Sequence, residues 1–130
     1  MSRRLAVVSS VLALGVALVG CGGDKGSGSA ASSASCGRPT GGSFTLVAKN
    51  VKFNVDCITL AQPGRLQITM RSEDQAAHNI HVSGHGVDSK TTLEAGPVTQ
   101  HLTVDLPAAG DYTFICDLHE FAMKGTIHVG

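Results

Sequence analysis

Apolar and polar residues alternate in short runs from residue 44 to the end of the chain, and these runs are rich in β-branched and aromatic side chains. Segments containing glycine and proline separate the runs, and no stretch keeps a helical period beyond a turn or two. The pattern predicts an all-β domain, a Greek-key β-sandwich of about eight strands. Strands are expected at Phe44–Ala48, Arg65–Met70, His78–Val82, Thr99–Val104, Asp111–Ile115 and Gly125–Val129.

The first 20 residues have the layout of a secretory signal. Arg3 and Arg4 precede the apolar run Leu5–Val19, which is too short to span a membrane on its own. The segment Leu18–Cys21 resembles the lipobox of bacterial lipoproteins. This resemblance implies that Cys21 carries a lipid and anchors the chain to the outer face of the cell membrane. An ordinary secretory signal followed by a chance cysteine is the alternative.

Residues 21–35 consist mostly of glycine, serine and alanine. Such a composition cannot bury enough apolar surface to offset the entropy of ordering, so we expect a flexible tether here and a folded domain over residues 36–130. Without the signal (1–20), eight basic residues remain against ten acidic ones, and no basic cluster occurs. A nucleic-acid partner is therefore not expected, and we expect a monomer.

The four cysteines have different expected roles. Cys36 and Cys57 lie in a chain exported to an oxidising space, where a disulfide between them is the natural pairing. The bridge would contribute about 3 kcal/mol by closing the loop between them. Two free buried thiols are the alternative. Cys116 is left over, and an unpaired thiol in an exported protein needs an explanation.

Cys116 opens a short segment that carries three kinds of metal donor. Cys116, His119 and Met123 lie within eight residues, and His78 lies 38 residues before Cys116. Because side chains alternate along a strand, Cys116 shares the apolar face of Tyr112 and is expected to point into the core. A thiolate, two imidazoles and a weak thioether suit copper in both common oxidation states. With a long axial methionine, this set is diagnostic of blue-copper electron-transfer sites.

Three parts of the sequence resemble the cupredoxin family, especially proteins of the plastocyanin, pseudoazurin and amicyanin type. These parts are Ala77–Ile80, Gly110–His119 and Met123–Ile127. The resemblance implies a cupredoxin-like fold with one type 1 copper per chain, and electron transfer through the exposed edge of the last histidine ligand. It implies that His78, Cys116 and His119 are the three equatorial ligands. Met123 is then the axial ligand, and Asn79 is the residue that braces the ligand loop.

The ligand loop departs from the family pattern in its length. Three residues separate His119 from Met123, whereas related loops commonly have two or four at this place. Because loop length sets the height of the sulfur above the ligand plane, the axial ligand is the open assignment. Glu120 is the competing oxygen ligand, and it would give a less blue site of lower potential.

Other residues near the ligand loop have alternative interpretations. His81 is expected on the opposite sheet face from His78, and His85, His101 and His128 are expected to be exposed. A second metal site with His81 and His85 stays open. Phe121 and Ala122 form either an apolar rim for a redox partner or, in the case of Phe121, part of the core. Asp117 and Glu120 either tune the site or are solvated surface charges.

We therefore expect a membrane-tethered copper protein that carries single electrons between redox proteins outside the cytoplasm. Copper capture, buffering or delivery with the same ligands is the alternative, and a metal-free interaction domain is a third hypothesis. An enzyme is not expected. A copper oxidase needs further copper centres with more histidines, and no oxyanion-binding or orienting residue accompanies the Cys-His pair.

Overall fold

The computed structural model describes residues 36–130. The expected signal (1–20), the lipid site at Cys21 and the tether (21–35) lie outside these residues and stay predictions. Within residues 36–130 every regular element is a strand. No helix in this part of the chain is long and apolar enough to cross a membrane.

Ten β-strands make up the described part of the chain. Eight of them have four residues or more, whereas β4 and β7 have only two. The strands are β1 (Ser43–Ala48), β2 (Cys57–Leu60), β3 (Gly64–Ser72), β4 (Ala77–His78), β5 (His81–Gly84), β6 (Val87–Lys90), β7 (Glu94–Ala95), β8 (Val98–Leu106), β9 (Gly110–Ile115) and β10 (Lys124–Val129).

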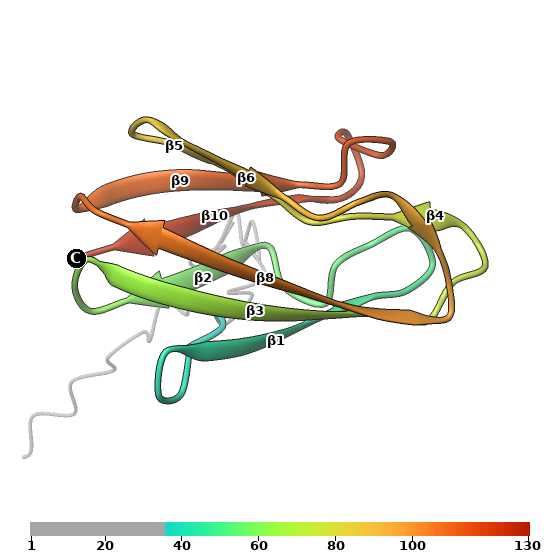
Figure 1. The fold of residues 1–130 in the computed structure, drawn as a ribbon, viewed down its shortest axis with the longest axis horizontal. Coiled ribbons are helices and arrows are strands. Elements are labelled where there is room, and N and C mark those ends of the chain that lie inside the picture. The colour runs from blue at the N-terminus through green and yellow to red at the C-terminus, as the bar shows by residue number, and fades with distance from the viewer. Residues whose placement is uncertain (1–35) are drawn as a thin grey trace, which may run out of the picture.

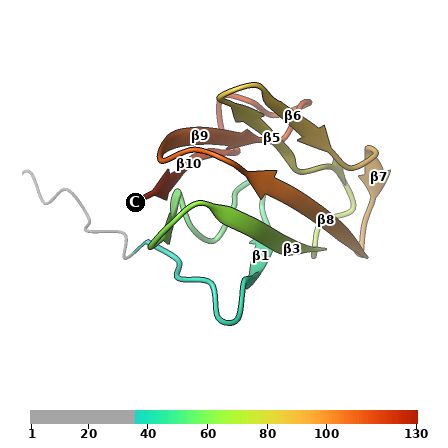
Figure 2. The same cartoon turned by 60° about the vertical axis from the view of Figure 1, so that its left-hand side comes forward.

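The eight longer strands form two facing sheets, and β4 and β7 form a small ladder beside them (Figures 1 and 2). One sheet has the order β1-β3-β8 and the other the order β2-β10-β9-β5-β6. β1 pairs with β3, and β2 with β10, in parallel, and the other pairs are antiparallel. Because β1 and β2, and later β8 and β9, belong to different sheets, the chain crosses repeatedly between them. The predicted all-β sandwich is confirmed.

One expected strand is divided in the structure. His78–Val82 was predicted as continuous, but β4 ends at His78 and β5 begins at His81. β4 pairs with β7, whereas β5 pairs with β6 and β9. The prediction of one strand was wrong because the buried Asn79 leaves the ladder and uses its side chain for other hydrogen bonds. The strands β2, β6 and β7 were not predicted, because each has at most one buried residue to mark an apolar alternation.

The hydrophobic core lies between the two large sheets. Inward and outward positions alternate along β3 and β8 over nine residues each. On β9, Tyr112 and Phe114 are buried, and Cys116 continues the same alternation into the core, as the sequence predicted. Further buried apolar residues are Leu46, Ile58, Leu66, Ile68, Met70, Val82, Leu102, Val104, Leu106, Ile127 and Val129.

A buried tyrosine fixes the start of β9, the strand that leads to Cys116. The phenol of Tyr112 donates a hydrogen bond to the carbonyl oxygen of Ala108 at 2.9 Å and accepts one from the N–H of Ala108 at 3.1 Å. The turn between β8 and β9 is thereby tied to the core, and the phenol hydroxyl is satisfied where it is buried.

Cys36 and Cys57 form a disulfide bond, with their Cα atoms 4.7 Å apart. Next to the bridge, the N–H of Gly37 donates a hydrogen bond to the carbonyl oxygen of Cys57, and the N–H of Thr59 donates one to the carbonyl oxygen of Gly37. The bridge therefore holds the first described residues against β2. The alternative of two free thiols is wrong.

Gly125 packs where β10 leaves the ligand loop. A Cβ atom at this position would overlap the ring of Phe114 and the carbonyl oxygen of Asp56. That carbonyl accepts a hydrogen bond from the N–H of Thr126 at 2.9 Å, so it has little freedom to move. The absence of a side chain at residue 125 lets the strand after the loop lie directly on the core.

We predict that Gly125→Ala lowers the free energy of unfolding by about 1–3 kcal/mol, because the added methyl group forces the ring of Phe114 out of its place. Gly64→Ala is the matched control, since a Cβ atom at Gly64 meets nothing within 4 Å. Urea unfolding of both variants measures the difference. Equal stability of the two variants would contradict the packing described here.

Candidate metal centre

Three side chains with metal-binding atoms meet at one end of the sandwich. They are His78 at the end of β4, and Cys116 and His119 in the loop between β9 and β10 (Figure 1). The Sγ atom of Cys116 lies 3.7 Å from Nδ1 of His78 and 3.6 Å from Nδ1 of His119. The two imidazole rings meet edge to face, with centroids 5.0 Å apart. Among residues 36–130 this is the only group of three or more His, Cys, Asp or Glu residues close enough to hold a metal ion.

The spacing of these atoms fits one metal ion between them. An ion bonded to a thiolate at about 2.3 Å and to an imidazole nitrogen at about 2.0–2.1 Å holds the two donors about 3.5–3.8 Å apart, at angles between tetrahedral and trigonal. Both observed separations from the sulfur fall in this range. His78 and Cys116 are fully buried, and His119 is partly exposed. The site is therefore closed on the core side and reaches the surface at His119.

Hydrogen bonds within the ligand loop fix its shape. The N–H of Cys116 donates a hydrogen bond to the carbonyl oxygen of Met123 at 2.9 Å. The N–H of Met123 donates one to the carbonyl oxygen of His119 at 2.7 Å. The N–H of His119 in turn donates to the carbonyl oxygen of Cys116 at 3.0 Å. A loop closed in this way positions its donor atoms through its own backbone.

The two candidates for the axial ligand differ in burial. Met123 is fully buried at the end of the loop, whereas Glu120 is exposed. A weak axial donor of a buried site has to come from a buried side chain. Burial therefore favours Met123 over Glu120.

Asn79 joins the His78 segment to the ligand loop. Its Oδ1 accepts a hydrogen bond from the N–H of Asp117 at 2.9 Å, and its Nδ2 donates to the carboxylate of Asp117 at 2.9 Å and to the carbonyl oxygen of Thr91 at 3.2 Å. The side chain is buried and its polar atoms are all paired. This is the arrangement expected of the bracing residue.

Gln100 is a buried polar residue that the sequence analysis missed. Its Nε2 donates to the carbonyl oxygen of His78 at 3.3 Å and to that of Thr92 at 2.9 Å, and its Oε1 accepts from the hydroxyl of Thr91. Gln100 thus fixes the backbone of the first histidine against β8. Its signal was a polar residue at an inward position of a strand whose other inward residues are apolar.

Asp117 is more than a solvated surface charge, since its side chain is only 26% exposed. Nδ1 of His81 and the ammonium group of Lys90 both pair with this carboxylate, at 2.7 Å and 3.2 Å. Burial alone would raise the pKa of Asp117, but the hydrogen bonds from His81, Asn79 and Lys90 outweigh it and lower the pKa to about 2.

His81 lies between two carboxylates, because its Nε2 also pairs with Asp88 at 2.7 Å. Burial tends to lower the pKa of His81, and the hydrogen bonds that its ring donates to Asp117 and Asp88 raise this pKa above its ordinary value on balance. Both ring nitrogens of His81 are engaged by carboxylates, and His85 packs on the ring of Tyr112 with centroids 4.8 Å apart. Among residues 36–130 the structure does not bring His81 and His85 together in a metal-binding cluster.

Several apolar side chains close to His119 in the sequence are exposed. Phe121 is 88% exposed and Leu118 is 58% exposed, and Ala122 is also exposed. The alternative core role of Phe121 is therefore wrong. Exposed aromatic and aliphatic side chains beside a buried site are typical of a surface that binds another protein.

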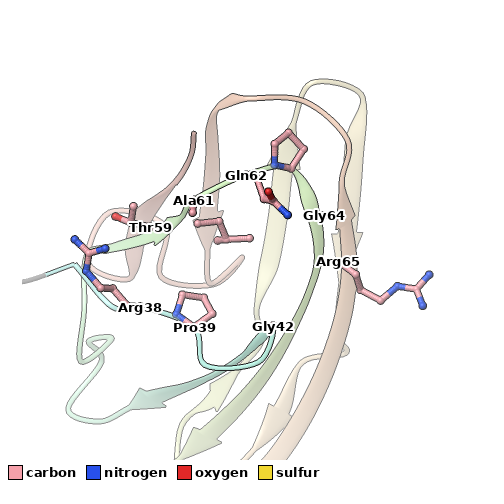
Figure 3. Close-up of a pocket in the computed structure, with 10 residues that line it drawn as sticks. Arg38, Pro39, Gly42, Thr59, Ala61, Gln62, Gly64 and Arg65 are labelled. Atoms are coloured by element: carbon pink, nitrogen blue, oxygen red, sulfur yellow. The ribbon is translucent and has the colours of Figure 1, made fainter.

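A surface cavity of about 490 Å³ lies at the other end of the sandwich (Figure 3). It is lined by the β2–β3 connection together with residues 38, 39 and 42. Leu60 in its wall pairs with Val129 at the end of β10, whereas the ligand loop precedes the start of this strand. None of the expected site residues lines the cavity, so it is separate from the donor cluster.

Comparison with known proteins gives the same fold. The sequence pattern of the family described as "Cupredoxin-like domain" matches residues 12–129. No curated protein matches the chain. Auracyanin A, a "blue" copper protein from Chloroflexus aurantiacus, is 18% identical over 72% of this chain and 100% of its own, with a TM-score of 0.59. The auracyanin of Roseiflexus castenholzii is 18% identical over 71% of this chain and 99% of its own, with a TM-score of 0.58. A reduced amicyanin variant is 18% identical over 71% of this chain and 86% of its own, with a TM-score of 0.53.

We predict that Asp117→Asn weakens the pH dependence of the free energy of unfolding on the acid side. The carboxyl titrates near 3.8 when unfolded and near 2 in the folded chain, so its ionised form stabilises the fold above about pH 4, and this contribution is lost as the pH falls through 2. The shift corresponds to at most about 2 kcal/mol. In urea unfolding of the metal-free chain, the wild type should lose about 1–2 kcal/mol more than the variant between about pH 5 and pH 2.

Asp105→Asn is the control, because Asp105 is an exposed carboxylate that pairs only with the exposed Arg65 among the described residues. We expect this variant to follow the wild-type profile. Parallel profiles of Asp117→Asn and wild type would contradict the assigned role of the Asp117 carboxylate.

Proposed function

Because the chain belongs to the family of cupredoxin-like domains, we propose that it is a type 1 copper protein that carries single electrons between redox proteins outside the cytoplasm. The observation that carries this proposal is the donor cluster of His78, Cys116 and His119. Two imidazoles and one thiolate are the equatorial set of blue-copper centres, and the fold supplies them in place.

The residues of the site fit copper better than a structural zinc. A structural zinc site takes four strong ligands, whereas this cluster offers three strong donors and, at Met123, a buried thioether. Copper, when bound, supplies a one-electron couple. Under this proposal, His78, Cys116 and His119 would hold it as the three strong donors, Met123 would add a weak thioether donor, and Asn79 would brace the loop.

The organisation of the site supports a carrier of electrons. The ligand loop is closed by its own hydrogen bonds, and Asn79 and Gln100 hold the segment of His78. Donors fixed in this way rearrange little when the charge of the metal changes, and a small rearrangement is what fast electron transfer requires. The apolar surface around His119 offers a redox protein a place to dock close to the metal.

The proposal places the protein on the outer face of the cell membrane as a monomer. A lipid on Cys21 anchors it there, and residues 21–35 form the tether. Two observations on the sequence support this location: the lipobox-like segment Leu18–Cys21 and the glycine- and serine-rich stretch that follows it. The disulfide between Cys36 and Cys57 is consistent with an oxidising compartment. The proposal includes no enzymatic activity, because a carrier needs one metal centre and no substrate site.

We predict that one equivalent of Cu(II) gives the purified full-length chain an intense blue thiolate-to-copper absorption band and a reversible voltammogram. Cys116→Ser should abolish the band, because it removes the thiolate. His128→Asn is the control: His128 is exposed, pairs with Asp111 at 2.6 Å, and lies near the far end of β10. A wild-type chain without the band would contradict the proposal, and a band without reversible cycling would favour copper capture or delivery instead.

A second pair of variants tests the axial ligand. We predict that Met123→Leu raises the reduction potential and shifts the absorption spectrum, because a lone-pair donor stabilises Cu(II) more than Cu(I) and leucine has none. Glu120→Gln should leave both the spectrum and the potential as in the wild type, since Glu120 is exposed. The reverse result would identify Glu120 as the axial ligand.

A further inference from the structure

The imidazole of His78 lies between the thiol and a carboxylate. Its Nδ1 is 3.7 Å from Sγ of Cys116, and its Nε2 is 2.9 Å from Oδ2 of Asp74. His78 is fully buried, and the side chain of Asp74 is only 14% exposed. The hydrogen bond between them is therefore largely shielded from water, where a bond to a charged acceptor is stronger than at the surface.

Asp74 is itself held by backbone groups from another part of the chain. The N–H of Asn50 donates to Oδ1 at 2.6 Å, and the N–H of Val51 donates to Oδ2 at 2.9 Å. Both residues have a positive φ, 52° and 55°, which costs about 1–2 kcal/mol each for residues with a side chain. The two amide hydrogen bonds to the carboxylate help to hold this strained turn. Asp74 is therefore fixed independently of His78.

Three donors converge on the carboxylate. Hydrogen bonds from the N–H of Val51, from His78 and from the N–H of Asn50 hold the pKa of Asp74 below its ordinary value. No lysine or arginine among the described residues pairs with Asp74. Its negative charge is thus directed at the imidazole of His78 and at two amides.

We propose that Asp74 is a positioning residue for the metal centre, which fixes the tautomer of His78 and favours the more highly charged state of the metal. A carboxylate acceptor keeps the ring hydrogen on Nε2, so the lone pair of Nδ1 points toward the site. The same arrangement makes the imidazole a stronger donor. A fixed negative charge on the far side of the ring stabilises Cu(II) relative to Cu(I), which lowers the reduction potential.

The chain offers a matched comparison in Asp88. Like Asp74, this carboxylate accepts a hydrogen bond from Nε2 of a histidine, His81, at 2.7 Å. His81 is not a member of the donor cluster, and Asp88 is 78% exposed. Removing either charge deletes one carboxylate–histidine pair, but only Asp74 acts on a residue of the metal centre.

This role rests on the proposed copper function, and the experiment separates the two. Wild type, Asp74→Asn and Asp88→Asn are loaded with Cu(II) as full-length chains, and the reduction potential of each is measured by voltammetry. Asp74→Asn should lower the affinity for Cu(II) relative to Cu(I) about tenfold. This corresponds to a rise in potential of about 59 mV for a one-electron couple. Asp88→Asn should stay at the wild-type value.

The outcomes are distinct. A copper–thiolate band with the same potential in wild type and Asp74→Asn would overturn the role of Asp74 and leave the copper function intact. A wild-type chain without the band would overturn the copper function, and the role with it. A lower stability of Asp74→Asn, expected from the turn at residues 50 and 51, would not by itself raise the potential.

A measurement on the unmodified, metal-free chain does not depend on the folding of any variant. Nitrogen–hydrogen correlation NMR of the histidine side chains reports which ring nitrogen of His78 carries the hydrogen. The hydrogen is expected on Nε2, bonded to Asp74. A hydrogen on Nδ1 in the neutral ring would overturn the proposal.

Discussion

Polar side chains that lie inside a hydrophobic domain cost free energy unless each of their polar atoms finds a partner. The donor cluster is subject to this constraint, because His78 and Cys116 are fully buried at the end of an apolar core. The surrounding structure follows from it. Asp74 pairs with the ring of His78, and Gln100 with its carbonyl oxygen. Asn79 is paired on both its oxygen and its nitrogen.

These partners also make the site rigid. They come from four separate places in the chain: the segment after β3, the residue after β4, the first half of β8 and the ligand loop. Each hydrogen bond restrains one segment against another, so the histidine and the cysteine are in place before a metal arrives. The hydrogen bonds that stabilise the buried polar groups are thus the same ones that, under the proposed function, would keep the rearrangement on electron transfer small.

The charges around the site are distributed unevenly. Asp74 acts on the buried side, at the imidazole of His78, whereas Asp117 lies beside the loop and is largely compensated by His81 and Lys90. On the exposed side, the loop carries the apolar side chains of Leu118 and Phe121 at the surface near His119 in sequence. Under the two proposals made above, partner docking and tuning of the metal belong to different faces, so that one can change in sequence without the other.

Sequence alone was enough to predict the strands with a clear apolar alternation, the inward direction of Cys116 and the residues of the donor cluster, because these depend on local period and on residue type. It did not reveal the break after His78, the backbone groups that hold Asp74, or the role of Gln100. Asn50 and Asp74 are 24 positions apart, and His78 and Gln100 are 22 apart. Such contacts leave no periodic trace in the chain. They arise from the fold, because a buried polar atom takes the partner that folding brings within reach, whatever its distance along the sequence.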